Sequence, residues 1–296
     1  MTRHFLEVDD LSAQELAAVL DLAAEPEPAR VLQGRGVALV FEKPSLRTRN
    51  STEIAVFELG GHPLTMRGDE VGLGQREPVA DVARVLSRYH AAICARVFDH
   101  LHLDELAAAA SVPVVNLLSD TSHPCQALAD LLTLRQHFGE LRGLEVAYVG
   151  DYNNVSRSLA IAGARTGIGL RLACPPGYGP TERDLEKLRL LGLDPVVTTR
   201  PAEAADGADA VYTDVWTSMG QEDESAGRRR AFEGFTVDAG VMAAAARHAV
   251  FLHCLPAHRG DEVAADVVDG RQSVVWEQAE NRLHAVRGLF LWLFGG

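Results

Sequence analysis

Hydrophobic residues follow two different periods along the chain, and the change between them marks the predicted elements. Residues 12–15 (Ser-Ala-Gln-Glu) form a capping box, after which apolar residues recur at helical spacing, at positions 16, 19, 20 and 23. The run at residues 37–41 (Val-Ala-Leu-Val-Phe) is instead continuously apolar and lies between Gly36 and Pro44, which predicts a buried strand. A first helix therefore precedes a first strand.

Strand and helix patterns then alternate over the rest of the chain. Further helices are predicted at residues 48–59, 79–88, 103–110, 124–137 and 278–293, and further strands at 62–66, 91–96, 114–117, 145–150, 170–173, 196–198, 210–213, 250–253 and 273–276. Such alternation favours parallel sheets. We predict an α/β fold of two lobes, each a mostly parallel sheet flanked by helices, linked by two inter-lobe helices. The predicted domains are residues 1–137 plus the C-terminal helix 278–296, and residues 138–277.

Composition limits the possible partners. The chain has 296 residues, of which 47% are hydrophobic, and this length favours two domains. Its formal charge is 28 − 41 = −13, which argues against binding to nucleic acid or to an anionic membrane surface. The N-terminus lacks an apolar signal region, and no apolar run approaches the roughly 20 residues that span a bilayer, so we expect a cytoplasmic protein. The four cysteines are irregularly spaced, which favours reduced thiols over a disulfide framework or a zinc site.

The first candidate for chemistry is the segment Ser45-Leu46-Arg47-Thr48-Arg49, where a strand gives way to a helix. A helix N-terminus presents free N–H groups that attract phosphate, and arginine side chains add charge-assisted hydrogen bonds. The alternative is a capped helix with two solvated arginines. The segment lacks the glycines and the lysine of a Walker A loop.

Three further residues of the first half suggest a site for an anion or a carbonyl group. Arg96 ends a predicted strand, and ligands of open α/β sheets gather at the carboxyl ends of strands. His123 and Gln126 flank the start of a long helix, where both can donate to a carbonyl oxygen. Each also has a simpler interpretation, as a surface arginine or as ordinary residues of a helix start.

The second half carries polar residues after three predicted strands. Gly150 is followed by Asn153 and Asn154 rather than by a glycine fingerprint, which disfavours NAD or FAD. Asp214 ends another strand and is able to hold an amine or merely to cap a turn. Cys254 lies between His253 and His258, which leaves a catalytic thiolate or a metal ligand as weak alternatives.

In this order along nearly the whole chain, the segments resemble the aspartate/ornithine carbamoyltransferase family, and within it the ornithine branch. The resemblance implies carbamoyl-phosphate contacts at Ser45, Leu46, Arg47, Thr48, Arg49, Arg96, His123, Gln126, Cys254, Leu255 and Arg282. It implies ornithine contacts at Asn154, Asp214, Ser218 and Met219, and catalytic roles for Arg96, His123, Asp214 and Cys254.

The sequence departs from the family pattern at two places. Leu46 replaces the threonine of the family's S-T-R-T-R segment, so a hydroxyl is lost. Gly72 stands where ornithine enzymes often carry a glutamine that contacts the substrate of a neighbouring subunit, with Gln75 or Arg76 as possible substitutes.

The activity implied by the resemblance is transfer of the carbamoyl group of carbamoyl phosphate to the δ-amine of L-ornithine. It needs no cofactor and no metal, and the implied assembly is a homotrimer or a multiple of it. The alternatives are a carbamoyltransferase for another amine and a non-catalytic ligand-binding paralogue.

Overall fold

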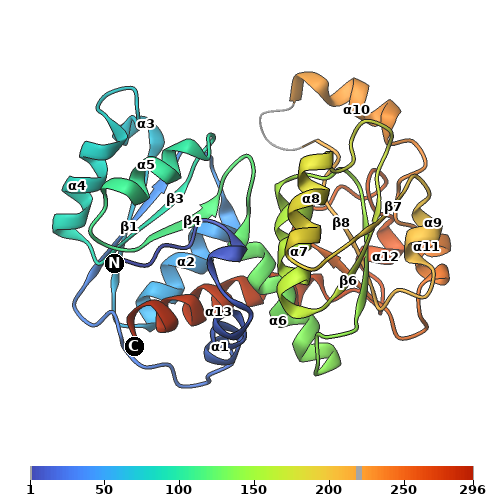
Figure 1. The fold of residues 1–296 in the computed structure, drawn as a ribbon, viewed down its shortest axis with the longest axis horizontal. Helices are drawn as coiled ribbons and strands as arrows, with labels where there is room; N and C mark the ends of the chain where they lie inside the picture. The colour runs from blue at the N-terminus through green and yellow to red at the C-terminus, as the bar shows by residue number, and fades with distance from the viewer. Residues whose placement is uncertain (1, 218–221, 296) are drawn as a thin grey trace. The chain divides into compact units, whose positions relative to one another are not determined.

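The chain divides into two compact units, Met1–Leu132 with Glu280–Gly296, and Thr133–Ala279 (Figure 1). The structure, a computed structural model, describes residues 2–217 and 222–295. Ser218 and Met219 therefore lie outside the described residues. Each unit is built on a parallel sheet flanked by helices, which confirms the predicted α/β class.

The first unit has a four-stranded sheet in the order β2-β1-β3-β4. Its strands are β1 (Gly36–Phe41), β2 (His62–Arg67), β3 (Ala92–Arg96) and β4 (Val114–Leu118). Its helices are η1 (Val8–Asp10), α1 (Ala13–Ala23), α2 (Leu46–Glu58), α3 (Gly68–Val71), α4 (Val79–Tyr89) and α5 (Leu101–Ala109), with the first part of α6 (Pro124–Phe138) and most of α13 (Val275–Phe294). The boundary between the units thus falls inside α6 and α13.

One face of this sheet is covered by α4 and α5. Alternate residues of the central strands, including Val40 and Ile93, pack with Val82 and Leu103 of these helices in one buried cluster. This follows from the period of two, which sends successive side chains of a strand to opposite faces.

Most of the final helix belongs to the first unit. Arg287 of α13 donates to the carbonyl oxygens of Ala23 and Glu25 at 3.3 and 2.8 Å. Next to it, Gly288 lets α13 approach α1 closely, because a Cβ there would lie 2.5 Å from the Val19 oxygen. The glycine is therefore a packing requirement.

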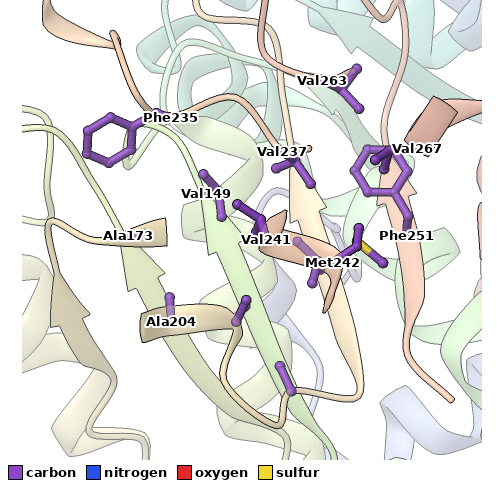
Figure 2. Close-up of a cluster of buried hydrophobic side chains, with 14 of the residues drawn as sticks. Val149, Ala173, Ala204, Phe235, Val237, Val241, Met242, Phe251, Val263 and Val267 are labelled. Carbon is purple, nitrogen blue, oxygen red and sulfur yellow. The ribbon is translucent and has the colours of Figure 1, made fainter. Parts of the chain in front are cut away.

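The second unit has a five-stranded parallel sheet in the order β7-β6-β5-β8-β9. Its strands are β5 (Glu145–Val149), β6 (Gly169–Ala173), β7 (Val196–Thr198), β8 (Ala210–Thr213) and β9 (Val250–His253). Its helices are α7 (Asn154–Thr166), α8 (Glu182–Leu190), α9 (Pro201–Ala205), η2 (Glu222–Glu224), α10 (Ser225–Ala231), α11 (Ala239–Ala244) and α12 (Ala265–Val268). Figure 2 shows the cluster in which Val149 and Phe251 of the sheet lie among Met242 of α11 and Val267 of α12.

One predicted strand is wrong. Residues 273–276 form a single bridge, between Ser273 and Phe251, and helix α13 begins at Val275. A short apolar run does not by itself distinguish a strand from the first turn of a buried helix, and here the helix prevails. Within residues 2–217 and 222–295, each helix is too short or too polar to cross a membrane.

Candidate active site

The strand order of the first unit predicts a ligand-binding position beside β1. The chain runs from β1 to β2 on one side and then to β3 on the other, so the order reverses between β1 and β3. Open α/β sheets bind ligands at such a switch point, outside the carboxyl ends of the strands. Phe41 pairs with Arg96 at these ends, and the Glu42 N–H donates to the Arg96 oxygen at 2.9 Å. The segment 45–49 and Arg96 therefore share one edge of the sheet.

Ser45 caps helix α2. Its backbone is extended, and its hydroxyl accepts a hydrogen bond from the Thr48 N–H at 3.2 Å. The cap uses one of the unpaired N–H groups of the first turn, and the helix dipole adds partial positive charge there. This local geometry suits an anion.

Behind the cap lies a buried arginine cluster, formed by Thr48, Arg96, Gln126 and Arg282. The Thr48 hydroxyl accepts hydrogen bonds from Arg96 at 3.3 Å and from Arg282 at 3.0 Å. Arg282 also donates to the Gln126 side-chain oxygen at 2.6 Å. All four side chains belong to residues that are at most 7% exposed. Two guanidinium groups held this close in a buried site favour an anionic ligand, since burial of like charge is costly.

His123 is buried next to this cluster. Burial lowers the pKa of His123 well below its usual range, and the positive charges of Arg282, Arg96 and Arg47 act in the same direction. The imidazole is therefore neutral near pH 7. A neutral imidazole is suited to a hydrogen bond with a carbonyl oxygen rather than to a role as cation.

Leu46 and Arg49 point away from the cluster. Leu46 is 75% exposed, and Arg49 donates to Glu53 at 2.9 Å. Both line a cavity of about 830 Å³ beside the start of α2, together with Ser45 and Arg67. Within the segment 45–49, Thr48 therefore faces the buried arginine cluster, whereas Leu46 and Arg49 face the cavity.

Gly72 closes helix α3 in a left-handed conformation. Its φ is 65°, and a Cβ there would lie 2.7 Å from the Arg76 Cβ. A glutamine is therefore strained at this position with this backbone. The Arg76 guanidinium donates to the Glu70 oxygen at 3.1 Å within the same loop. Substitution of the family's glutamine by Gln75 or Arg76 stays a prediction.

In the second unit, Asp214 follows β8 and gathers three donors. Asn153 and the Cys254 thiol donate to its two carboxylate oxygens, each at 2.9 Å, and the Val215 N–H donates at 2.8 Å. Asn153 also caps helix α7 by accepting from Val155 at 2.9 Å. The strand order again reverses beside β5, so this carboxylate lies at a switch point.

The hydrogen-bond partners of His253 argue against Cys254 as a metal ligand and against Cys254 as a catalytic thiolate with His253 as its base. Asp214, His253 and Cys254 offer possible metal-ligand atoms within 4.8 Å of one another. However, His253 Nδ1 accepts from the Leu255 N–H at 2.8 Å, which leaves Nε2 to donate to Glu262 at 3.2 Å. Hydrogen bonds from His253 and His258 lower the pKa of Glu262 although burial acts to raise it. Both ring nitrogens of His253 are thus occupied, so this imidazole is not available to bind a metal or to take a proton from Cys254.

Several residues of these networks were not identified as site residues from the sequence. Asp151, two residues after β5, forms a buried ion pair with Arg228, which also donates to the Trp216 carbonyl oxygen. Asp151 is at the end of a strand, which is a usable signal. Arg228 is the first of three consecutive arginines, and nothing in the sequence distinguishes the buried one. Asn153, which the sequence marked only as a polar residue after a strand, donates to Asp214, whereas the role of Asn154 stays a prediction.

Comparison with known proteins gives consistent results over both units. Residues 3–136 match the aspartate/ornithine carbamoyltransferase carbamoyl-P binding domain, and residues 142–293 match the Asp/Orn binding domain of the same family. Ornithine carbamoyltransferase of Acidothermus cellulolyticus is 54% identical, over 99% of this chain and 97% of the relative. The structure of ornithine carbamoyltransferase from Pyrococcus furiosus is similar with a TM-score of 0.95 at 45% identity, over 99% of this chain and 97% of that one.

A more distant solved structure has a different name. It is an acetylornithine transcarbamylase complexed with acetylcitrulline, 32% identical, with a TM-score of 0.89 and 99% of each chain covered. The relative and the two solved structures each cover both units. The chain belongs to the aspartate/ornithine carbamoyltransferase family and is a carbamoyl-group transferase.

Proposed function

We propose that this enzyme transfers the carbamoyl group of carbamoyl phosphate to the δ-amine of L-ornithine, giving L-citrulline and phosphate. The observation that carries the proposal is the buried arginine cluster, in which Arg96 and Arg282 both donate to the Thr48 hydroxyl. Its two positive charges match a small phosphorylated donor. The product, L-citrulline, places the proposed reaction in arginine metabolism.

The first unit binds the donor. Phosphate oxygens lie at the N-terminus of α2, where Ser45, Arg47 and Thr48 stand beside the guanidinium groups of Arg96 and Arg282. Neutral His123 and the Gln126 amide hydrogen-bond the carbamoyl oxygen. Such donors stabilise the negative charge that develops on this oxygen when an amine adds.

The second unit binds the acceptor. Asp214 attracts the δ-amine, and Cys254, which donates to Asp214 at 2.9 Å, fixes the direction of the carboxylate. Asn154 and the Ser218–Met219 stretch, which lies outside the described residues, hold the amino-acid end. Cys254 and Leu255 also contact the carbamoyl group in this proposal.

The chemistry needs no covalent enzyme intermediate. The δ-ammonium group first loses one proton to solvent, and the freed lone pair forms the C–N bond to the carbamoyl carbon, which leaves that nitrogen positively charged. The tetrahedral oxyanion then collapses, the C–O bond to phosphate breaks, and the departing phosphate takes the second proton from this nitrogen. The enzyme contributes mainly orientation and electrostatic stabilisation, which together account for large accelerations in enzymes.

Arg47→Ala tests the donor site. The purified variant should need at least tenfold more carbamoyl phosphate for half-maximal rate, because a charge-assisted hydrogen bond to phosphate is worth roughly 1.5–3 kcal/mol. The control is Arg200→Ala, an exposed arginine paired with Glu203. Near-normal turnover and affinity in Arg47→Ala would refute the phosphate site.

A second candidate function is carbamoyl transfer to another amine, which the similarity to an acetylornithine transcarbamylase supports. The wild-type enzyme is therefore supplied with carbamoyl phosphate and a panel of amines, with phosphate release and ureido product as readouts. Product from ornithine alone supports the first candidate, and product from another amine alone supports the second.

The assembly and location are proposed from the sequence and the resemblance alone. We expect a homotrimer in the cytoplasm. Light scattering of the purified protein measures its mass in solution, and a monomeric mass would contradict the trimer.

A further inference from the structure

Asp130 is a fully buried carboxylate on helix α6, one turn after Gln126. The Gln126 side-chain N–H donates to Asp130 at 2.8 Å. Burial of a carboxylate is costly, so a fully buried aspartate in this helix requires a reason. Sequence reasoning assigned Asp130 no role.

The chemistry of its neighbours fixes the orientation of the Gln126 amide. An arginine only donates hydrogen bonds, so it can be bonded only to the oxygen of a side-chain amide. The amide nitrogen of Gln126 must therefore face Asp130, and its oxygen must face Arg282, which donates to it at 2.6 Å. The opposite orientation sets N–H against N–H and oxygen against oxygen.

The alignment continues to the anion site. Arg282 uses one terminal nitrogen for Gln126 and the other for the Thr48 hydroxyl, at 3.0 Å, where Arg96 also donates. A guanidinium is planar and rigid, so holding one terminal nitrogen restricts where the other can lie.

We propose that Asp130 is a positioning residue for carbamoyl-phosphate binding, acting through Gln126 on Arg282. This inference rests on the proposed function, since it assigns carbamoyl phosphate to the arginine cluster. Asp130 orients the amide, the amide holds Arg282 against Thr48, and the two arginines are thereby ready for the phosphate. Asp130 touches neither substrate.

Asp130→Asn tests this role because asparagine has the same shape but is able to donate as well as accept. Steady-state kinetics should show a KM for carbamoyl phosphate raised at least tenfold, with the KM for ornithine within twofold of wild type and kcat within threefold. Leu131→Ala is the control. It truncates a buried neighbour on the same helix, and it should lower the melting temperature without changing either KM.

A double-mutant cycle separates positioning from a general effect on the fold. In a Gln126→Ala background, Asp130→Asn should raise the KM for carbamoyl phosphate by less than twofold. The reason is that the Gln126 amide, through which Asp130 acts on Arg282, is then absent. Multiplicative effects of the two changes, or an unchanged KM in the single variant, would overturn the proposal. If Asp130→Asn is insoluble, Asp130→Ser replaces it in the same cycle with the same expectations.

The two proposals fail in different ways. If wild type forms no ureido product with carbamoyl phosphate and any amine, the proposed function fails, and this inference, which rests on it, fails too. If wild type is active and Asp130→Asn keeps a normal KM for carbamoyl phosphate, only the positioning role fails.

Discussion

The Thr48 hydroxyl is the point at which the arginine cluster meets helix α2, and its removal has a calculable effect. In Thr48→Val the shape is kept, but Arg282 and Arg96 lose the acceptor that now lies at 3.0 and 3.3 Å. The shorter bond has normal N–H···O length and the longer one lies beyond it. A hydrogen bond to a charged group contributes roughly 1.5–3 kcal/mol to stability. Counting the Arg282 bond in full and the longer Arg96 bond in part, we expect the substitution to cost about 2–3 kcal/mol.

The loss should appear as lower stability of the unliganded protein. At about 2–4 °C per kcal/mol for a chain of this size class, the melting temperature should fall by roughly 4–12 °C. Saturating phosphate should narrow this difference, because phosphate oxygens then replace the hydroxyl as acceptors for both arginines. Thr48→Ser, which keeps the hydroxyl, should lie close to wild type.

Thr52→Val is the matched control. Thr52 lies one turn further along α2 and is fully buried, and its hydroxyl has no hydrogen-bond partner among the described residues. Its replacement should be neutral or slightly stabilising, since an unsatisfied buried polar group is removed. A Thr48→Val protein as stable as wild type without ligand, or a deficit that phosphate leaves unchanged, would refute the assignment of the cluster as an anion site.

Two further predictions concern the second unit. Cys254→Ser should raise the KM for ornithine several-fold and leave the KM for carbamoyl phosphate near normal, because the thiol orients Asp214; a covalent adduct of the wild-type thiol in mass spectrometry would contradict this role. Asp151→Asn should make the free energy of unfolding less dependent on pH between about pH 4 and about pH 6. Burial raises the pKa of Asp151 from 3.8 to about 6, although Arg228 opposes the rise. The folded state therefore holds this proton longer than the unfolded state, and the group's contribution to stability falls as pH rises from about 4 to about 6. The free energy of unfolding, measured in urea across this pH range, should show this contribution in wild type and lack it in Asp151→Asn. If the free energies of the two proteins change in parallel with pH, the proposed titration of Asp151 is refuted.

Local signals in the sequence determined most of the secondary structure. The capping box at Ser12 and Glu15, the proline that opens α6 and the apolar runs of the strands each act within a few residues, and the structure follows them. The wrong strand at residues 273–276 shows the limit of such signals. Its short apolar run suits either element, and only the packing of α13 resolves the choice.

The arginine cluster needed tertiary structure. Arg282 lies 156 residues from Gln126 and 234 residues from Thr48 along the chain, and no periodic pattern links positions so far apart. The resemblance to a family predicted that these residues meet. The return of α13 onto the first unit places them within hydrogen-bonding distance.

The sequence by itself determined which elements form and which residues are candidates for the chemistry, because propensity, capping and hydrophobic period are local properties of the chain. Only the tertiary structure decided the partners of those residues. It turned Arg49 toward Glu53, joined Asn153 to Asp214, and placed Asp130 behind Gln126. Hydrogen bonds are short and directional, so the pairing of buried polar groups depends on how distant segments pack, and that information is absent from any single stretch of sequence.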